Sequence, residues 1–169
     1  MRLKNHILSL FIIVLTMNSC ASDSVDSVSN KELSVSSAVV TDYTYDQSEL
    51  ETMKLINEYR VSIGLNELKA INHISFKSDE HNAYMITNKV VNHDDFVARS
   101  ENIIKVLGAI KVSENVAYNY NNSNSVLNAW LNSPDHKKNL DGEYTHIGIS
   151  ISINPANGKK YYTNMFMRK

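Results

Sequence analysis

The sequence predicts an α+β domain in which helices pack against an antiparallel sheet. Two observations lead to this class: amphipathic helical segments fill most of the chain after residue 46, and strict two-residue alternation appears close to the C-terminal end. Strands and helices do not alternate regularly, as they would around a parallel sheet. Helices first and strands last therefore favour a layered domain with an antiparallel sheet.

Length and composition are those of one ordinary domain. The chain has 169 residues, 43% of them hydrophobic, which suits a single apolar core. Its 17 basic and 18 acidic residues give a formal charge of -1, which argues against a phosphate-binding or nucleic-acid-binding protein, since these normally carry a basic excess or a basic face. The single cysteine excludes an internal disulfide framework and a cysteine-rich zinc cluster.

Helices are expected in order along the first part of the domain. Apolar residues recur on one face of residues 47–63, 74–88, 97–107 and 123–131, and Gly64 ends the first of these segments. A further helix is expected to begin at Ser133, because a serine, a proline and an acid follow one another there in the order that favours a helix start.

Strands are expected toward the C-terminal end. Residues 147–153 alternate isoleucine with small residues, as a strand with one buried face does. Residues 154–158 (NPANG) predict a turn, so residues 160–167 can return as the partner strand of a hairpin. Residues 116–120 (VAYNY) are a third strand candidate.

Residues 1–19 resemble the signal peptide of a bacterial lipoprotein. Arg2 and Lys4 precede an apolar run over residues 7–17, which is too short to span a bilayer of about 30 Å but suits a secretory signal. The only cysteine, Cys20, follows Ser19 where a signal peptidase would cut. We expect cleavage before Cys20 and lipidation of this residue; the alternative is a plain secretory signal with an incidental cysteine, and then a secreted protein.

Residues 20–45 are expected to form a flexible, serine-rich tether between the lipidated Cys20 and a domain over residues 46–169. An edge strand at residues 37–43 is the less favoured alternative. Loss of Arg2 and Lys4 with the signal would change the formal charge from -1 to -3. The anchor would place the protein in the bacterial cell envelope, on the periplasmic face or the cell surface, away from ATP and nicotinamide cofactors.

Few side chains offer chemistry, and the sequence has no glycine-rich phosphate loop, HExxH or GxSxG motif. Ser133, Asp135 and His136 are close in sequence, but a catalytic triad needs proximity in space, so a helix cap is the preferred interpretation. The remaining candidates are His93, Glu114 and His136.

Other polar residues have structural explanations. His81 lies on a helical stripe and is expected to be a partly buried structural histidine, whereas His73 and His146 lie near element starts and are expected at the surface. Arg60 and Arg99 are expected to make surface or capping interactions.

Several short motifs follow one another in order over residues 47–168. They are Asn57-Glu58-Tyr59-Arg60, Gly64-Leu65-Asn66-Glu67-Leu68, residues 81–85 (HNAYM), Asn92-His93, Phe96-Val97-Ala98-Arg99, Ser113-Glu114-Asn115-Val116-Ala117-Tyr118, Trp130-Leu131-Asn132-Ser133-Pro134-Asp135-His136, Ile147-Gly148-Ile149 and Tyr162-Thr163-Asn164-Met165-Phe166. This set resembles the CAP superfamily, also called the SCP domain, which includes cysteine-rich secretory proteins, insect venom antigen 5 and plant pathogenesis-related proteins. The chain is most similar to its short, disulfide-free bacterial branch.

The resemblance implies a three-layer α-β-α sandwich with a central antiparallel sheet and a large cleft. Two histidines and acidic residues line that cleft, which in some members holds a divalent metal such as zinc. Matched position by position, the histidines are His93 and His136 and the acid is Glu114. Glu101 has a similar Ser-Glu-Asn context, but only Glu114 is followed by Val-Ala-Tyr. The second acid of many eukaryotic members has no clear counterpart here.

Two interpretations of His93, Glu114 and His136 stay open. Two imidazoles and a carboxylate suit Zn2+ and leave a position for water or substrate, and Glu114 could instead be the general base of a hydrolase. Alternatively, the three form a hydrogen-bonded polar network at the cleft floor. Asn115, Tyr118 and Trp130 are candidates to line a ligand cleft, although a tryptophan on an apolar helical face is more often part of the core.

The functional expectation is a membrane-tethered extracytoplasmic module that binds a lipid, glycan or peptide without turnover. A zinc-dependent hydrolase acting on peptide or envelope material is one alternative, and a surface interaction protein with a vestigial cleft is another. We expect a monomer whose partners are the membrane and a small ligand, with no nucleic acid.

Overall fold

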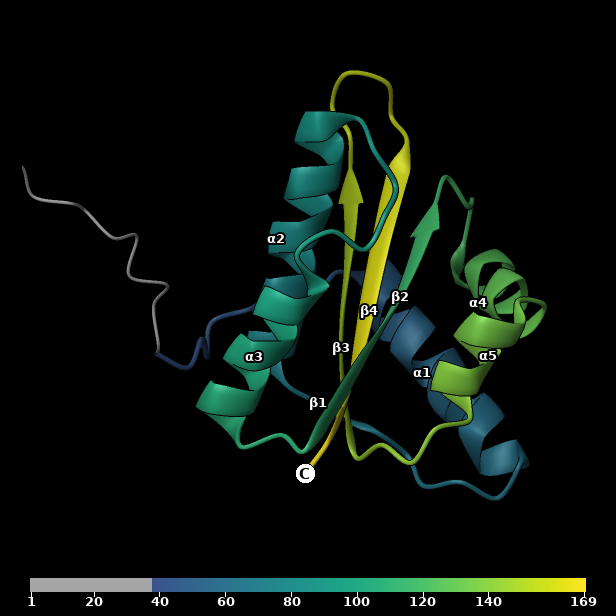
Figure 1. Cartoon of the computed structure of the whole chain (residues 1–169). Coiled ribbons are helices and arrows are strands. Elements are labelled where there is room, and N and C mark those ends of the chain that lie inside the picture. The colour runs from purple at the N-terminus through teal and green to yellow at the C-terminus, as the bar shows by residue number, and fades with distance from the viewer. Residues whose placement is uncertain (1–37) are drawn as a thin grey trace, which may run out of the picture. The chain divides into compact units, whose positions relative to one another are not determined.

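The computed structural model describes residues 38–169, which belong to one compact unit (Figure 1). The expected signal peptide, Cys20 and the tether as far as residue 37 lie outside the described residues. Within residues 38–169, no helix is both long enough and apolar enough to cross a bilayer.

The described residues form five helices and four strands. In chain order they are α1 (Gln47–Ser62), β1 (Lys69–Ala70), α2 (Asn72–Asn88), α3 (Phe96–Leu107), β2 (Lys111–Tyr118), α4 (Ser123–Leu131), α5 (Pro134–Leu140), β3 (His146–Ile153) and β4 (Lys160–Arg168). The strand order is β1-β3-β4-β2, with β1 parallel to β3 and the other pairs antiparallel. The expected α+β class and its sandwich of helices around a sheet are confirmed.

Helices cover both faces of the sheet, with α2 and α3 on one face and α1, α4 and α5 on the other (Figure 1). Side chains of β4 alternate between two cores: Met165 packs with residues of α2 and α3, whereas Phe166 packs with residues of α1 and α4. Because successive strand residues point to opposite faces, this one strand divides the two apolar layers.

The backbones of α2 and β3 approach each other closely where the helix crosses the strand. A Cβ atom placed on Gly148 would lie 2.4 Å from the backbone nitrogen of Ser75, so only glycine allows this crossing. The hydroxyl of Ser75 accepts a hydrogen bond from the backbone N–H of Ile149 at 3.0 Å. The position of α2 on the sheet is therefore fixed by backbone contact as well as by apolar packing.

The second strand is longer than the sequence predicts. We expected a strand over residues 116–120, but β2 begins at Lys111 and pairs with β4 along its whole length. Glu114 and Asn115 are therefore strand residues, and their side chains point to opposite faces of the sheet.

Residues before α1 contact the domain, although the free tether was expected to continue to residue 45. The N–H of Val40 donates to Nδ1 of His73 at 3.1 Å, the hydroxyl of Tyr43 donates to Glu49 at 2.7 Å, and the hydroxyl of Ser75 donates to that of Tyr45 at 3.0 Å. His73 is consequently only 1% exposed, which corrects the expectation that it lies at the surface.

Candidate functional site

The site is built around Glu114, whose side chain is 1% exposed although it lies in an edge strand. Nδ1 of His93 lies 2.8 Å from Oε1 of Glu114. His93 belongs to the loop between α2 and α3, and its side chain is 51% exposed. The carboxylate therefore fixes one nitrogen of His93 and leaves the other facing outward.

Arg99 holds the second side of this carboxylate. Its Nε donates to Oε2 of Glu114 at 3.0 Å, and its Nη2 donates to both carboxylate oxygens, at 2.9 and 2.8 Å. Its Nη1 donates to the backbone carbonyl of Asp94 at 2.7 Å. Arg99 thus neutralises Glu114 and also fixes the residue that follows His93.

The expectation that Arg99 makes surface or capping interactions is wrong, because Arg99 is 8% exposed. The sequence contains one signal that could have placed it: Arg99 stands four residues before Ile103, so the two share the buried face of α3. Arg60 is fully buried, where its guanidinium donates to the carbonyls of Leu140 and Gly142. For Arg60 the capping expectation holds and the surface expectation does not.

His81 contacts the loop between α2 and α3 that carries His93. Its Nε2 lies 2.9 Å from the carbonyl oxygen of Asn92 and 3.9 Å from Oε1 of Glu114. Its Nδ1 is buried with no hydrogen-bond partner among the described residues. Burial lowers the pKa of His81 below its ordinary value. A proton at Nδ1 would find no acceptor, so this histidine is neutral and structural, as the sequence predicts.

His136 approaches from α5, on the opposite side of the sheet edge from α2. Burial lowers its pKa, and a positive charge on the nearby His93 lowers it further. Its backbone carbonyl accepts a hydrogen bond from Asn115 at 3.0 Å, and Asn115 in turn accepts one from Asn139 at 2.8 Å. Asn115 is fully buried, so its side chain positions the backbone of α5 at His136.

The titratable side chains of the site do not form a closed metal cluster. Within residues 38–169, no group of three His, Cys, Asp or Glu side chains is arranged to hold a metal ion. Both oxygens of Glu114 are already engaged by Arg99 and His93. The ring nitrogens of His136 and Nε2 of His93 have no hydrogen-bond partner within that range, so they are the groups free to meet a ligand.

A hollow of about 320 Å³ adjoins His136. It is lined by Val116, Ala117, Tyr118, Tyr120, Ala129, Trp130, Ser133 and His136. Trp130 is 1% exposed and its Nε1–H donates to the carbonyl of Val116 at 3.2 Å, so it is chiefly a core residue, as expected, and shows only an edge to the hollow. Tyr118 lines the hollow, whereas Asn115 does not.

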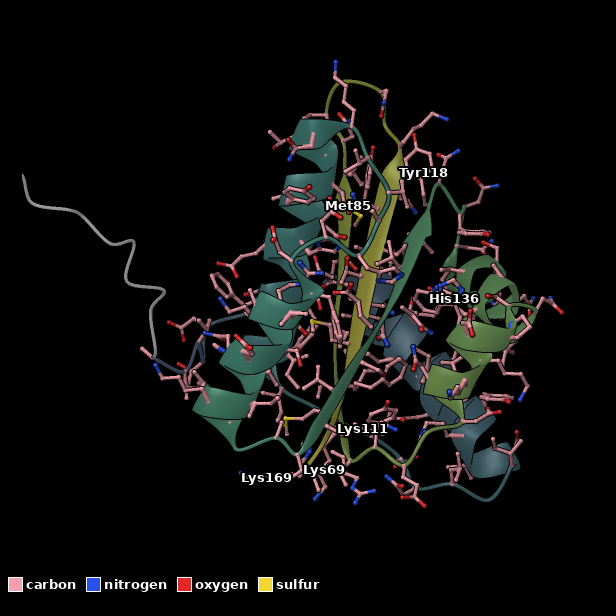
Figure 2. The ribbon with its side chains drawn as sticks, in the orientation of Figure 1. Lys69, Met85, Lys111, Tyr118, His136 and Lys169 are labelled. Atoms are coloured by element: carbon pink, nitrogen blue, oxygen red, sulfur yellow. The ribbon has the colours of Figure 1, made fainter. Side chains whose placement is uncertain are left out.

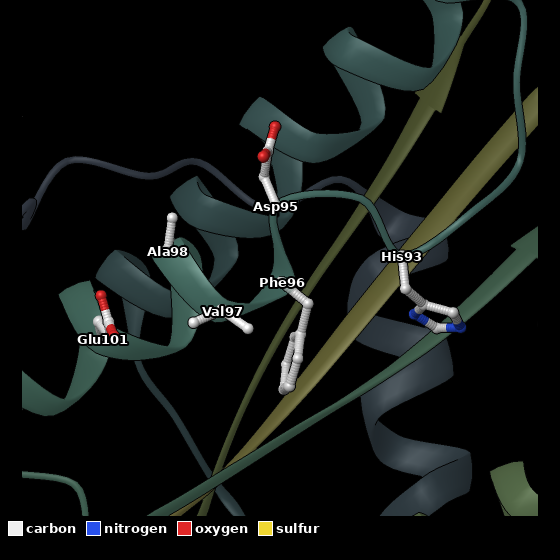
Figure 3. Close-up of a pocket in the computed structure, with 6 residues that line it drawn as sticks. All are labelled: His93, Asp95, Phe96, Val97, Ala98 and Glu101. Carbon is white, nitrogen blue, oxygen red and sulfur yellow. The ribbon is translucent and has the colours of Figure 1, made fainter.

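A second hollow, of about 610 Å³, adjoins His93. Figure 3 shows the rings of His93 and Phe96 projecting to the same side of the chain at the start of α3. Val97 and Ala98 continue the apolar wall, and Asp95 and Glu101 contribute carboxylates. Each histidine of the site therefore stands at the edge of a partly apolar hollow.

Replacing Arg99 with methionine should destabilise the protein by about 3–5 kcal/mol, because the buried charge of Glu114 loses its partner. Chemical denaturation measures this cost, and adding Glu114→Gln to the variant should recover part of it. Arg168→Met is the control, since the pair of Arg168 with Glu143 is exposed and removing it should cost at most about 1 kcal/mol. Equal costs for Arg99→Met and Arg168→Met would contradict a buried ion pair.

Acidification should destabilise the protein through its buried histidines. The pKa values of His81 and His136 are lowered from 6.5, so as the pH falls below 6.5 the unfolded chain takes up protons that the folded state refuses. The contribution of these histidines to stability is thus fully present above pH 6.5 and declines below pH 6.5. His81→Gln does not titrate and can still donate to Asn92, so urea unfolding between about pH 7.5 and about pH 5.5 should show a smaller decline in this variant. An undiminished decline would show that His81 is not responsible.

A protein of known sequence resembles this chain. The chain is 28% identical over 135 residues to the membrane protein YlbC of Bacillus subtilis, an alignment covering 72% of this chain and 35% of that relative. This chain therefore spans about a third of the relative's length.

Solved structures share the fold. An extracellular protein with an SCP domain from Bacillus anthracis matches with a TM-score of 0.63 and 25% identity, over 72% of this chain and 40% of that one. An outer surface protein of Borrelia burgdorferi matches with a TM-score of 0.63 and 20% identity, over 77% of this chain and 99% of the other. A cysteine-rich secretory protein of Staphylococcus aureus matches with a TM-score of 0.60 and 22% identity, over 76% of this chain and 41% of that one.

The family model described as CAP, the cysteine-rich secretory protein family, matches residues 53–166, from within α1 to within β4. This match covers most of the chain and contains His93, Arg99, Glu114 and His136. The chain therefore belongs to the CAP family of cysteine-rich secretory proteins.

Proposed function

We propose that this protein is an extracytoplasmic binding module that holds its ligand at His93 and His136 and does not turn it over. One observation carries the proposal: both oxygens of Glu114 are engaged by Arg99 and His93, while the outward nitrogens of the two histidines are free. The site thus offers two imidazole nitrogens for recognition, while its buried carboxylate has no free oxygen.

Glu114 is poorly suited to be the general base of a hydrolase. A base must accept a proton from water at hydrogen-bond distance, whereas this carboxylate is buried and both of its oxygens already accept hydrogen bonds from Arg99 and His93. Its position instead suits it to orient His93. The binding module is therefore favoured over the zinc-dependent hydrolase.

A divalent metal fits the site if the histidines are the ligands and Glu114 lies behind them. A carboxylate that accepts from the second ring nitrogen of a histidine is the usual outer partner of a metal-bound imidazole. Nε2 of His93 and a ring nitrogen of His136 would hold the ion, with other positions left for water or ligand. When bound, the ion would supply a Lewis-acidic anchor for an oxygen of the ligand.

The proposed location is the bacterial cell envelope. The relatives include proteins named as extracellular, outer-surface and membrane proteins, which fits an envelope or secreted location. Lipidation at Cys20 would make the protein membrane-tethered, with the domain acting as a monomer on the outer side. A surface protein with a vestigial cleft is the alternative that the following experiments address.

Zinc titration calorimetry on the intact protein tests the histidine pair. Binding with one ion per chain is expected. His93→Ala and His136→Ala should each abolish it, because either substitution leaves a single imidazole to hold the ion. Glu114→Gln should weaken binding by about tenfold or more through misorientation of His93. His146→Ala is the control, because His146 lies at the start of β3, outside the site. Absence of binding to the folded protein would remove the metal from the proposal.

Ligand binding can be read from Trp130, the only tryptophan of the chain, whose edge meets the hollow beside His136. We expect a saturable change in its emission with one of three probes: lauric acid, an N-acetylglucosamine trimer or a short peptide. Ala129→Phe should abolish the response by filling the hollow, whereas Asn128→Gln, on the exposed side of α4, should not. No response to any probe would favour the vestigial cleft.

A further inference from the structure

Basic side chains from all four strands gather at one end of the sheet. The register pairs Lys69 of β1 with His146 of β3, and Lys111 of β2 with Arg168 of β4. Lys169 follows directly after β4. Figure 2 shows Lys69, Lys111 and Lys169 together at the end of the molecule opposite Met85 and Tyr118.

Most of this positive charge is uncompensated. Arg168 pairs with Glu143 at 2.8 Å, but among residues 38–169 no carboxylate lies within ion-pair distance of Lys69, Lys111 or Lys169. Burial lowers the pKa of His146, and the charges of Lys69 and Lys169 lower it further. A positive potential therefore acts at this end of the sheet, although the whole chain has a formal charge of -1.

A hollow of about 390 Å³ opens at this end, between β2 and α5. Its lining consists of Lys111, Val112, Ser113, Asp135, Lys138, Asn139 and Tyr144. Nζ of Lys111 lies 4.7 Å from the centre of the Tyr144 ring, so the ammonium group is held against the wall. Two lysines and one acid, Asp135, are among the residues that line the hollow.

The hydroxyl of Ser113 supplies an independent observation. Its oxygen is buried and has no hydrogen-bond partner among the described residues, although Ser113 lines the hollow. A buried hydroxyl without a partner loses the free energy of a hydrogen bond, and a rotation of the Ser113 side chain toward an acceptor in the hollow would restore it. An acceptor in the hollow would therefore meet positive charge and hydrogen-bond donors, from Lys111, Lys138 and Ser113.

We propose that the hollow between β2 and α5 is a binding site for a phosphate group. Ammonium groups attract its negative charge, and a hydroxyl donor can bond one of its oxygens, which makes such contacts stronger than those between neutral groups. Lys69 and Lys169 extend the attracting potential beyond the hollow. Neither His93 nor His136 lines this hollow, and Ser113 points to the opposite face of β2 from Glu114.

Titration of the intact protein with inorganic phosphate, followed by amide NMR at constant ionic strength, tests the site. We expect saturable shifts at Ser113 and Lys138, and Lys111→Gln and Lys138→Gln should each weaken binding by at least about fivefold. Ser113→Ala should weaken it without changing the net charge. Lys54→Gln, an exposed change on α1, is the control and should leave the affinity unchanged. Shifts that do not saturate, or that weaken equally in Lys54→Gln, would overturn the proposal.

Vesicles distinguish a lipid headgroup from a soluble phosphate compound. Sedimentation with phosphatidylglycerol and with phosphatidylcholine vesicles compares the lysine variants with Lys54→Gln, so that an N-terminal anchor contributes equally to each. Weaker sedimentation of Lys111→Gln and Lys138→Gln on phosphatidylglycerol alone would identify a lipid phosphate as the ligand. Phosphate binding with no difference on vesicles would identify a soluble phosphate compound.

Discussion

The buried ion pair between Arg99 and Glu114 is the interaction on which the site depends. A carboxylate with a 1% exposed side chain in an edge strand would be strongly disfavoured without a partner. The guanidinium supplies that partner and also binds the carbonyl of Asp94. One arginine thereby connects α3, β2 and the loop that carries His93. A change in the packing of α3 against β2 would therefore also move His93.

This pairing also decides what the site can do chemically. A buried carboxylate whose two oxygens are already engaged has none left to bind a water molecule, but it is a good support for an imidazole. His81, neutral because its Nδ1 has no acceptor in the described structure, adds a second support through Asn92 without adding charge. The polar network and the metal site, which were alternatives at the level of sequence, are therefore compatible: the network orients a histidine that a metal or ligand can then meet.

The sequence predicted what local periodicity encodes and missed what strand register decides. The helices, the hairpin of β3 and β4, the core position of Trp130 and the family residues His93, Glu114 and His136 follow from spacing and motif. Arg99 was misplaced, because no local pattern says which carboxylate a buried arginine meets. The start of β2 was missed because four of residues 111–115 are polar, and the pairing that makes them a strand is with β4, which is distant in the sequence.

The net charge of the chain was a poor guide to its surface, because the strand register decides which charged residues lie together. A formal charge of -1 argued against phosphate binding, yet that inference assumes that charges are spread evenly. The register brings Lys69, Lys111 and Lys169 together from distant parts of the chain. Acids gather elsewhere, with Asp95 and Glu101 around the hollow at His93. A nearly neutral chain can thus carry a basic surface at one end of its sheet, so each surface must be judged by its own charges.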